Sequence, residues 1–215
     1  MSAVDMRSPL SLLGRHRIIP VYTPDSEHDA VEVSRALLRG GIGVIEITLR
    51  TPVAMEAIRA VAAEVPGMAV GAGTVLDISQ MHQAQQAGAV FAVSPGAPAE
   101  LLDAAKGTHL VYLPGVATST EIMAGLAAGY TLFKVFPAEP INALALLSAW
   151  QGPFPRARFC PTGGITATRA RAYLQRPNVA CLGGSWLTPS DAIARGDWEA
   201  IESLARAAVR LSGAV

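Results

Sequence analysis

A lysine in the middle of an apolar run is the residue in this sequence best suited to covalent chemistry. The stretch TLFKVFPAE, residues 131–139, is typical of a buried β-strand and contains Lys134. The chain has fifteen Arg and only two Lys, Lys106 and Lys134, so it uses arginine where it needs only positive charge. Arginine keeps its proton at any working pH, whereas a desolvated lysine can lose it. Lys134 is therefore a candidate amine nucleophile, the alternative being a strand-end lysine whose ammonium reaches solvent.

A glutamate and an arginine in another strand-like run could assist such an amine. Glu46 lies between Ile45 and Ile47, so its side chain points to the opposite face from theirs. A solvated surface glutamate is unexpected there if helices cover the sheet. Glu46 is a candidate general acid or base; the alternative is one half of a structural ion pair, for which Lys134 itself is a candidate partner. Arg50 offers a planar guanidinium that matches a carboxylate, or is a surface residue where a helix starts.

Small polar residues and glycines follow other strand-like runs. Thr74, at the end of GAGT, could contact a substrate or simply cap the next helix. The runs PTGG (161–164) and GGS (183–185) could present backbone N–H groups to a phosphate, and either run alone is typical of a turn. Together the two glycine pairs indicate a phosphate site.

One repeated unit positions these residues. Short β-branched runs alternate with amphipathic segments at an interval of about 20–26 residues, the size of one βα unit. The helical segments carry ordinary start signals: Pro52 in a first turn, Asp77 as a cap, and a capping box of Thr118 and Glu121. The expected strands are 17–22, 43–48, 68–73, 90–94, 110–115, 131–136, 157–162 and 179–184.

Eight strands alternating with helices predict an α/β protein with a parallel sheet closed into a (β/α)₈ TIM barrel. We expect a short N-terminal helix before the barrel and one domain over residues 1–215; a doubly wound open sheet is the second choice. Active sites of barrels lie at the carboxyl ends of the strands. The barrel therefore gathers Lys134, Glu46, Arg50 and Thr74 at one end.

Composition limits the partners. The formal net charge is zero and no Lys/Arg run exists, so the charge balance gives no support for binding nucleic acid or an anionic membrane. No stretch of eighteen apolar residues predicts a membrane span, and residues 1–17 do not resemble a signal peptide, so a cytoplasmic location is expected. The four histidines lack ligand spacing, so no metal site is expected. Cys160 and Cys181 are interpreted as small buried hydrophobes, with a disulfide as the alternative.

Six motifs follow one another along nearly the whole chain: EITLRTP (46–52), GAGTVL (71–76), SPG (94–96), FKVFPAE (133–139), FCPTGGI (159–165) and GGSWL (183–187). Together they resemble the 2-keto-3-deoxy-6-phosphogluconate (KDPG) aldolase family, also known as 4-hydroxy-2-oxoglutarate aldolases. The resemblance implies a class I aldolase: a homotrimer with no metal or organic cofactor. It would cleave KDPG to pyruvate and glyceraldehyde 3-phosphate, and also 4-hydroxy-2-oxoglutarate to pyruvate and glyoxylate.

The resemblance also assigns roles to individual residues. It makes Lys134 the Schiff-base lysine and Glu46 the general acid and base. Arg50 and Thr74 would hold the carboxylate of the keto acid. The stretch EPINALALL after the lysine strand departs from the Gly-rich stretch common in the family, which affects loop detail. The phosphate would be held by Gly163, Gly164, Gly184 and Ser185, and the pocket lined by Pro95, Phe136 and Thr162.

Elementary chemistry agrees with these roles, and three other functions stay open. An attacking amine must be unprotonated, which burial and the positive charge of Arg50 would both favour. An aldolase for the galactonate-series phosphate would need the same residues. A non-catalytic phosphosugar-binding barrel would keep the glycine pairs without needing Lys134 or Glu46. A barrel isomerase or decarboxylase would use the phosphate site without a Schiff base.

Overall fold

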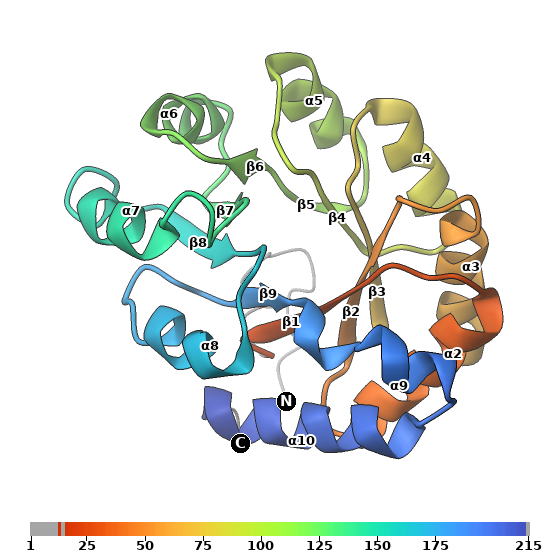
Figure 1. Cartoon of the computed structure of the whole chain (residues 1–215). Coiled ribbons are helices and arrows are strands. Elements are labelled where there is room, and N and C mark those ends of the chain that lie inside the picture. The colour runs from red at the N-terminus through yellow and green to blue at the C-terminus, as the bar shows by residue number, and fades with distance from the viewer. Residues whose placement is uncertain (1–12, 14–15, 214–215) are drawn as a thin grey trace, which may run out of the picture.

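The computed structural model describes residue 13 and residues 16–213 as strands and helices that alternate along the chain and in space (Figure 1). Each of the eight expected stretches contains a strand, which confirms the predicted alternation. The expected N-terminal helix falls on residues outside the described part of the chain. The strands are β1 (Ile18–Tyr22), β2 (Val44–Thr48), β3 (Ala69–Gly73), β4 (Phe91–Val93), β5 (Val111–Leu113), β6 (Gly115–Val116), β7 (Leu132–Val135), β8 (Arg158–Pro161) and β9 (Leu182–Gly184).

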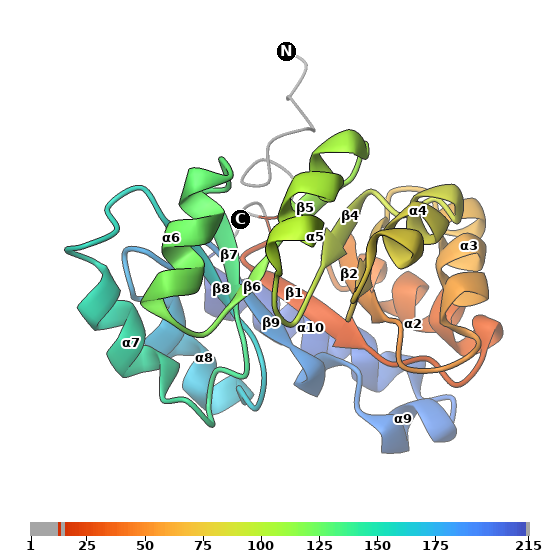
Figure 2. The same cartoon turned by 90° about the horizontal axis from the view of Figure 1, so that it is seen from above.

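The helices lie on the outer side of the curled strands, as Figures 1 and 2 show from two directions. None of those within the described ranges is both long and apolar enough to cross a membrane. They are α2 (Glu27–Arg39), α3 (Ala54–Glu64), α4 (Ile78–Gln86), α5 (Ala99–Ala104), α6 (Ser119–Ala127), α7 (Ala143–Trp150), α8 (Ala167–Leu174), α9 (Ser190–Ala194) and α10 (Trp198–Ser212), with short 3₁₀ turns η1 (Ala105–Gly107) and η2 (Ser185–Leu187).

All the described strands pair in parallel, as the alternation with helices predicts, but they form two sheets and not the single closed sheet that was expected. One has the order β5-β4-β3-β2-β1-β9 and the other β6-β7-β8. Pro114 separates β5 from β6, and its carbonyl accepts a hydrogen bond from the Lys134 N–H at 2.9 Å. On the other side, the isolated parallel bridge between Thr162 and Gly183 connects the end of β8 to β9.

Local sequence signals explain several helix starts. Asp77 caps α4 by accepting from the Gln80 N–H, and Thr118 and Glu121 form the predicted capping box of α6. Pro52 differs from the prediction, because α3 begins at Ala54 and Pro52 lies in the turn before it. The caps involve only residues close together in the sequence, so they form as predicted. The chain after β2 instead makes a turn that includes Pro52, and α3 therefore begins two residues later.

The strand that carries Lys134 is held by aromatic packing on its other face. Phe133 and Phe159, on β7 and β8, have ring centroids 6.2 Å apart, and Phe159 lies 5.5 Å from Trp150 of α7. Side chains alternate along a strand, so Lys134 points away from this cluster. On α6, a Cβ placed on Gly125 would overlap the Phe133 ring, so this helix approaches β7 closely. The core thereby fixes the position of Lys134.

Replacing Gly125 with alanine tests this close approach. Alanine in a helix interior is normally more stable than glycine by about 1 kcal/mol. Here the added methyl group would overlap Phe133, so we expect Gly125→Ala to lower the free energy of unfolding by about 1–3 kcal/mol, measured by urea denaturation. Gly152→Ala is the control, because its methyl group would meet no atom within 4 Å. A stabilised Gly125→Ala protein would contradict the packing described for α6.

Candidate active site

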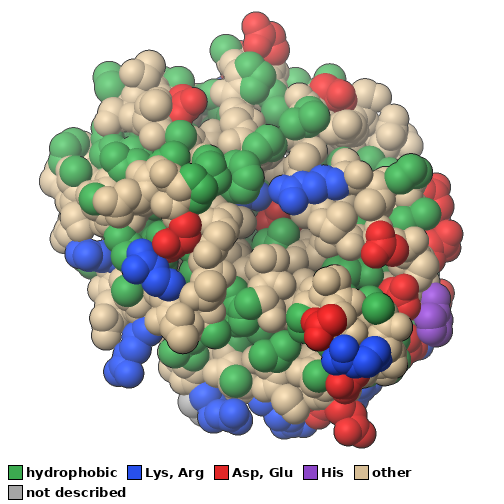
Figure 3. Space-filling model, viewed as in Figure 1, with side chains coloured by type: hydrophobic (Ala, Val, Ile, Leu, Met, Phe, Trp, Pro, Cys, Tyr) green, Lys and Arg blue, Asp and Glu red, His purple; other side chains and the backbone are tan. Residues whose placement is uncertain are grey.

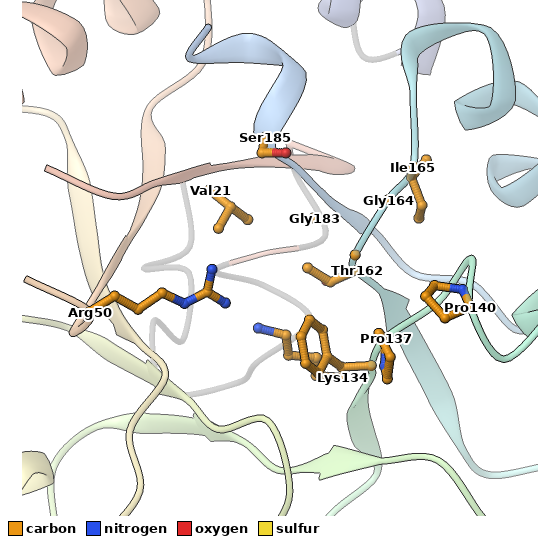
Figure 4. A pocket seen from close by; sticks show the side chains of 12 residues that line it. Val21, Arg50, Lys134, Pro137, Pro140, Thr162, Gly164, Ile165, Gly183 and Ser185 are labelled. Carbon is orange, nitrogen blue, oxygen red and sulfur yellow. The ribbon is translucent and has the colours of Figure 1, made fainter. Parts of the chain in front are cut away.

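A pocket of about 330 Å³ lies at the carboxyl ends of the strands (Figure 4). In Figure 3 the same face shows basic and apolar side chains around a central hollow. Seven of the residues that the sequence singles out line the pocket: Arg50, Lys134, Phe136, Thr162, Gly163, Gly164 and Ser185. The remaining lining residues are Val21, Pro137, Pro140, Ile165 and Gly183.

Lys134 lines this pocket, and its amine contacts Glu46, which is not among the lining residues. The Lys134 ammonium donates to Glu46 Oε1 at 3.0 Å, from β7 across to β2. Their side chains are only 3% and 4% exposed, so water screens the pair poorly. Lys134 Nζ also lies 5.2 Å from the centre of the Phe136 ring. The ion pair between Glu46 and Lys134, which the sequence offered as the alternative to a catalytic role, is thus present. Its geometry equally allows a direct proton transfer between the two groups.

Gly73 makes room for the Glu46 carboxylate. A Cβ at this position of β3 would overlap Glu46 Oε1 and lie 2.6 Å from Glu46 Cγ. Sequence analysis missed this role, although a glycine within a strand often marks a close approach of another group. Any side chain at Gly73 would displace Glu46 from its position beside Lys134.

Arg50 and Thr74 form a second pair, at the rim. The Arg50 Nε donates to Thr74 Oγ1 at 3.2 Å, and Figure 4 shows the Arg50 guanidinium and the Lys134 amine directed into the same space. Thr74 has a φ of 60°, a left-handed conformation that is unusual for a β-branched residue. Such a conformation costs about 1–3 kcal/mol. Asp77, and not Thr74, caps α4, so helix capping does not account for Thr74.

The two glycine runs lie together on the opposite side of the pocket. Gly163 and Gly164 have φ values of 107° and 78°, which favour glycine, and a Cβ on Gly163 would lie 3.1 Å from the Phe136 ring. Ser185, which comes directly after β9, also lines the pocket. Gly183 lines the pocket, whereas a Cβ on Gly184 would overlap the Trp186 ring. A phosphate role for Gly184 therefore stays a prediction.

Other sequence predictions fall outside the lining. Pro95 is not a lining residue; its backbone lies against Gly115, where an added Cβ would overlap it. Pro140 and Ile165 were missed because loop paths are not visible in strand and helix periodicity. Val21 could have been found, since it lies near the carboxyl end of β1.

The potential metal ligands and thiols give no second centre. Over residues 13 and 16–213, no group of three or more His, Cys, Asp and Glu side chains could hold a metal ion. Cys160 and Cys181 are buried free thiols and do not form the disulfide that was the alternative interpretation. The pKa of the Cys181 thiol is raised well above its ordinary value. The main cause is a hydrogen bond with the Cys160 thiol, and burial is the second. Protonated, buried thiols of this kind behave as small hydrophobes.

Comparisons with known proteins identify the family of the chain. The family profile described as aldolase, KDPG and KHG aldolase, matches residues 10–204. The KHG/KDPG aldolase of Escherichia coli strain K12 is 46% identical over 93% of each chain. A KDPG aldolase structure from Legionella pneumophila, with pyruvate captured at low pH as a covalent carbinolamine intermediate, gives a TM-score of 0.91 at 43% identity, covering 94% of this chain and 98% of that one. The structure of the 2-keto-3-deoxy-6-phosphogluconate aldolase of Zymomonas mobilis ZM4 with 3-phosphoglycerate gives a TM-score of 0.88 at 44% identity. The match covers 94% of this chain and 95% of that one. The chain belongs to the KDPG and KHG aldolase family.

Proposed function

We propose that this protein is a class I aldolase that cleaves KDPG to pyruvate and glyceraldehyde 3-phosphate, and 4-hydroxy-2-oxoglutarate to pyruvate and glyoxylate. The observation that carries the proposal is the buried contact of 3.0 Å between Lys134 Nζ and Glu46 Oε1, where Lys134 lines the pocket. The names of the relatives support the choice of substrates. A Schiff base is also consistent with the carbinolamine captured in the Legionella pneumophila enzyme.

The first step forms the bond between enzyme and substrate. Lys134 passes a proton to Glu46, and its free amine attacks the keto carbon C2 to give a carbinolamine. The transfer turns two buried charges into two neutral groups, which burial favours. Glu46 then returns the proton to the carbinolamine hydroxyl, which leaves as water. The product is an iminium on Lys134, with Glu46 ionised again.

The second step breaks the carbon–carbon bond. Glu46 accepts the proton of the C4 hydroxyl, directly or through a water, and the electrons of the C3–C4 bond move into the iminium to give an enamine. The aldehyde leaves from the C4 side. Protonation of the enamine at C3, followed by hydrolysis, releases pyruvate and regenerates the Lys134 amine. One carboxylate therefore serves as both base and acid.

The rest of the pocket orients the substrate. Arg50 and Thr74 hold the carboxylate of the keto acid, because a guanidinium and a hydroxyl at 3.2 Å from each other offer adjacent donors. Phe136 and Thr162 line the pocket, Pro95 supports it from outside the lining, and Lys134 and Glu46 act between the two ends of the substrate. The phosphate is held by Gly163, Gly164, Gly184 and Ser185, an assignment that rests on the family resemblance. The Zymomonas mobilis aldolase structure with 3-phosphoglycerate supports a phosphorylated ligand.

The buried pair also separates the alternatives. A phosphosugar-binding barrel, or an isomerase or decarboxylase without a Schiff base, has no use for two desolvated charges beside its pocket. The galactonate-series phosphate needs the same groups, so only a panel of the three substrates distinguishes it. No metal or organic cofactor takes part, since the iminium supplies the electron sink.

We infer that the two sheets belong to one closed eight-stranded barrel in a single domain spanning residues 1–215. Four observations support closure. On one side, β5 pairs with β4, β6 pairs with β7, and only Pro114 separates β5 from β6. On the other side, Thr162 bridges to Gly183 of β9. β5 and β6 then count as two halves of one interrupted strand.

We further propose that the protein is a homotrimer and lies in the cytoplasm. A homotrimer is supported by the resemblance, and the large exposed apolar side chains Leu76, Val90 and Met123 offer surface for contacts. Light scattering should then give three times the mass of one chain. A cytoplasmic location is supported by the two free thiols, Cys160 and Cys181, which suit a reducing compartment.

Trapping with pyruvate and borohydride tests the covalent step. We expect a pyruvate-derived mass on the peptide that contains Lys134, measured by mass spectrometry, and no activity in Lys134→Arg because a guanidinium cannot act as the amine. Lys106→Arg is the control. Lys106 is exposed and paired with Asp103 at 2.8 Å, so the activity of the Lys106→Arg protein should equal that of the unmodified protein. Label on Lys106, or an active Lys134→Arg protein, would refute the assignment.

Ser185→Ala tests the phosphate end. A hydrogen bond to a charged group contributes about 1.5–3 kcal/mol, so kcat/KM for KDPG should fall roughly 10–100-fold. Cleavage of 4-hydroxy-2-oxoglutarate should change much less, because this substrate has no phosphate. Both substrates use the same Lys134 and Glu46, so the ratio of their kcat/KM values isolates binding at the phosphate end. An equal loss for both substrates would show that Ser185 supports the barrel or the catalytic centre instead.

Gly73→Ala tests the position of Glu46. The added methyl group would overlap the carboxylate, and a displacement of about 1 Å can reduce a rate roughly 100-fold. We therefore expect kcat to fall by about that factor for both substrates, with the protein still folded by circular dichroism. Gly107→Ala, whose methyl group meets nothing within 4 Å, should keep full activity. Full activity in Gly73→Ala would mean that the exact place of Glu46 is unimportant.

A further inference from the structure

Glu139, the last residue of FKVFPAE, takes no part in the chemistry described above, yet its carboxylate joins two elements beside the pocket. Tyr173 of α8 donates its hydroxyl to Glu139 Oε1 at 2.8 Å. Arg169 of the same helix lies 3.2 Å from the other carboxylate oxygen, Oε2. Tyr173 is only 1% exposed. The contact is therefore anchored in the core at one end and is not a loose surface ion pair.

The backbone of Glu139 holds the glycine turn. Its N–H donates to the Gly163 carbonyl at 3.0 Å, and the neighbouring Ala138 N–H donates to the Thr162 carbonyl at 2.8 Å. A Cβ on Gly164 would lie 3.0 Å from Glu139 Cβ, so the turn rests directly on this residue. Figure 4 shows Gly164 and Ile165 across from Pro137 and Pro140 of the same loop.

These contacts enclose the turn from both sides. The loop from β7 supports Gly163 and Gly164 through its backbone, and the Glu139 side chain reaches past them to α8, the helix that the turn leads into. Loss of the side chain would remove the link from the loop to Arg169 and Tyr173 of α8. Both glycines have left-handed φ values, so the directions of their N–H groups depend on this local geometry.

We propose that Glu139 is a positioning residue that fixes the Gly163–Gly164 turn and thereby sets the affinity for the phosphorylated end of the substrate. The proposal rests on the proposed function for the place of the phosphate. The charge of Glu139 by itself would repel a phosphate. The Arg169 guanidinium and the Tyr173 hydroxyl offset that charge, so the effect of Glu139 is geometric.

Direct binding of 3-phosphoglycerate, measured by calorimetry on the full chain, tests this role without requiring turnover. We expect Glu139→Ala to raise its Kd about 10-fold, and Tyr173→Phe about 3-fold, because each removes part of the link to α8. Glu139→Gln should stay within about 3-fold of the unmodified protein, because its amide oxygen can still accept from Tyr173. In all three, the rate of pyruvate trapping at Lys134 by borohydride should stay within about 2-fold.

Glu202→Ala is the matched control. Glu202 of α10 is paired with Arg39 at 2.9 Å and with Arg206 at 2.6 Å, and its side chain is 23% exposed against 27% for Glu139. It does not line the pocket, so loss of this equally exposed ion-pair network should leave the Kd for 3-phosphoglycerate unchanged. Thermal denaturation of every variant identifies any that fails to fold, and Tyr173→Phe then carries the test.

An unchanged Kd in Glu139→Ala, or a parallel loss of phosphoglycerate binding and pyruvate trapping, would overturn the positioning role. Failure of the unmodified chain to bind 3-phosphoglycerate would overturn it as well, because the turn would then not be a phosphate site. The proposed function fails separately: a chain whose phosphoglycerate binding depends on Glu139 but which cleaves neither substrate supports the positioning role and refutes the aldolase.

Discussion

The buried contact between Lys134 and Glu46 is the interaction on which the site depends. Both side chains are almost fully removed from water, and the effective desolvation penalty is several kcal/mol for each ion. A buried ion pair of this kind often stabilises a protein no better than well-packed apolar residues would. Stability alone is therefore a poor reason for placing two charges beside a pocket. Reversible proton transfer between an amine and a carboxylate is a better one, and the 3.0 Å separation permits it.

Space and support around this pair come from different kinds of structure. The amine and the carboxylate stand on strands, where aromatic packing behind β7 and the absence of a side chain at Gly73 fix them closely. The glycine turn lies between elements and has no such backing. Its geometry is instead defined by hydrogen bonds from the Ala138–Glu139 backbone and by the reach of Glu139 to α8. The Lys134 end of the pocket is thus built on strands of both sheets, and the opposite end on linked loops.

The sequence alone indicated the elements and the main chemical groups because these signals are local. Alternating β-branched runs and helical segments located a strand in each of the eight expected stretches. The Asp77 cap and the Thr118 capping box involve residues only three positions apart, so they appear in the structure as predicted. Lys134 and Glu46 stood out because a charged residue in an apolar strand is costly without a partner or a task.

Tertiary structure decided which groups meet, because that depends on register and packing between segments far apart in the chain. Glu46 and Lys134 are 88 positions apart, and no local pattern fixes their separation. The space that Gly73 leaves for the carboxylate, the presence of Gly183 and not Gly184 in the pocket lining, and the link from Glu139 to Tyr173 depend equally on neighbouring strands and loops. Even the left-handed backbone of Thr74 goes against its own preference as a β-branched residue. The sequence thus determined the parts and their chemistry, and the packed fold determined their contacts.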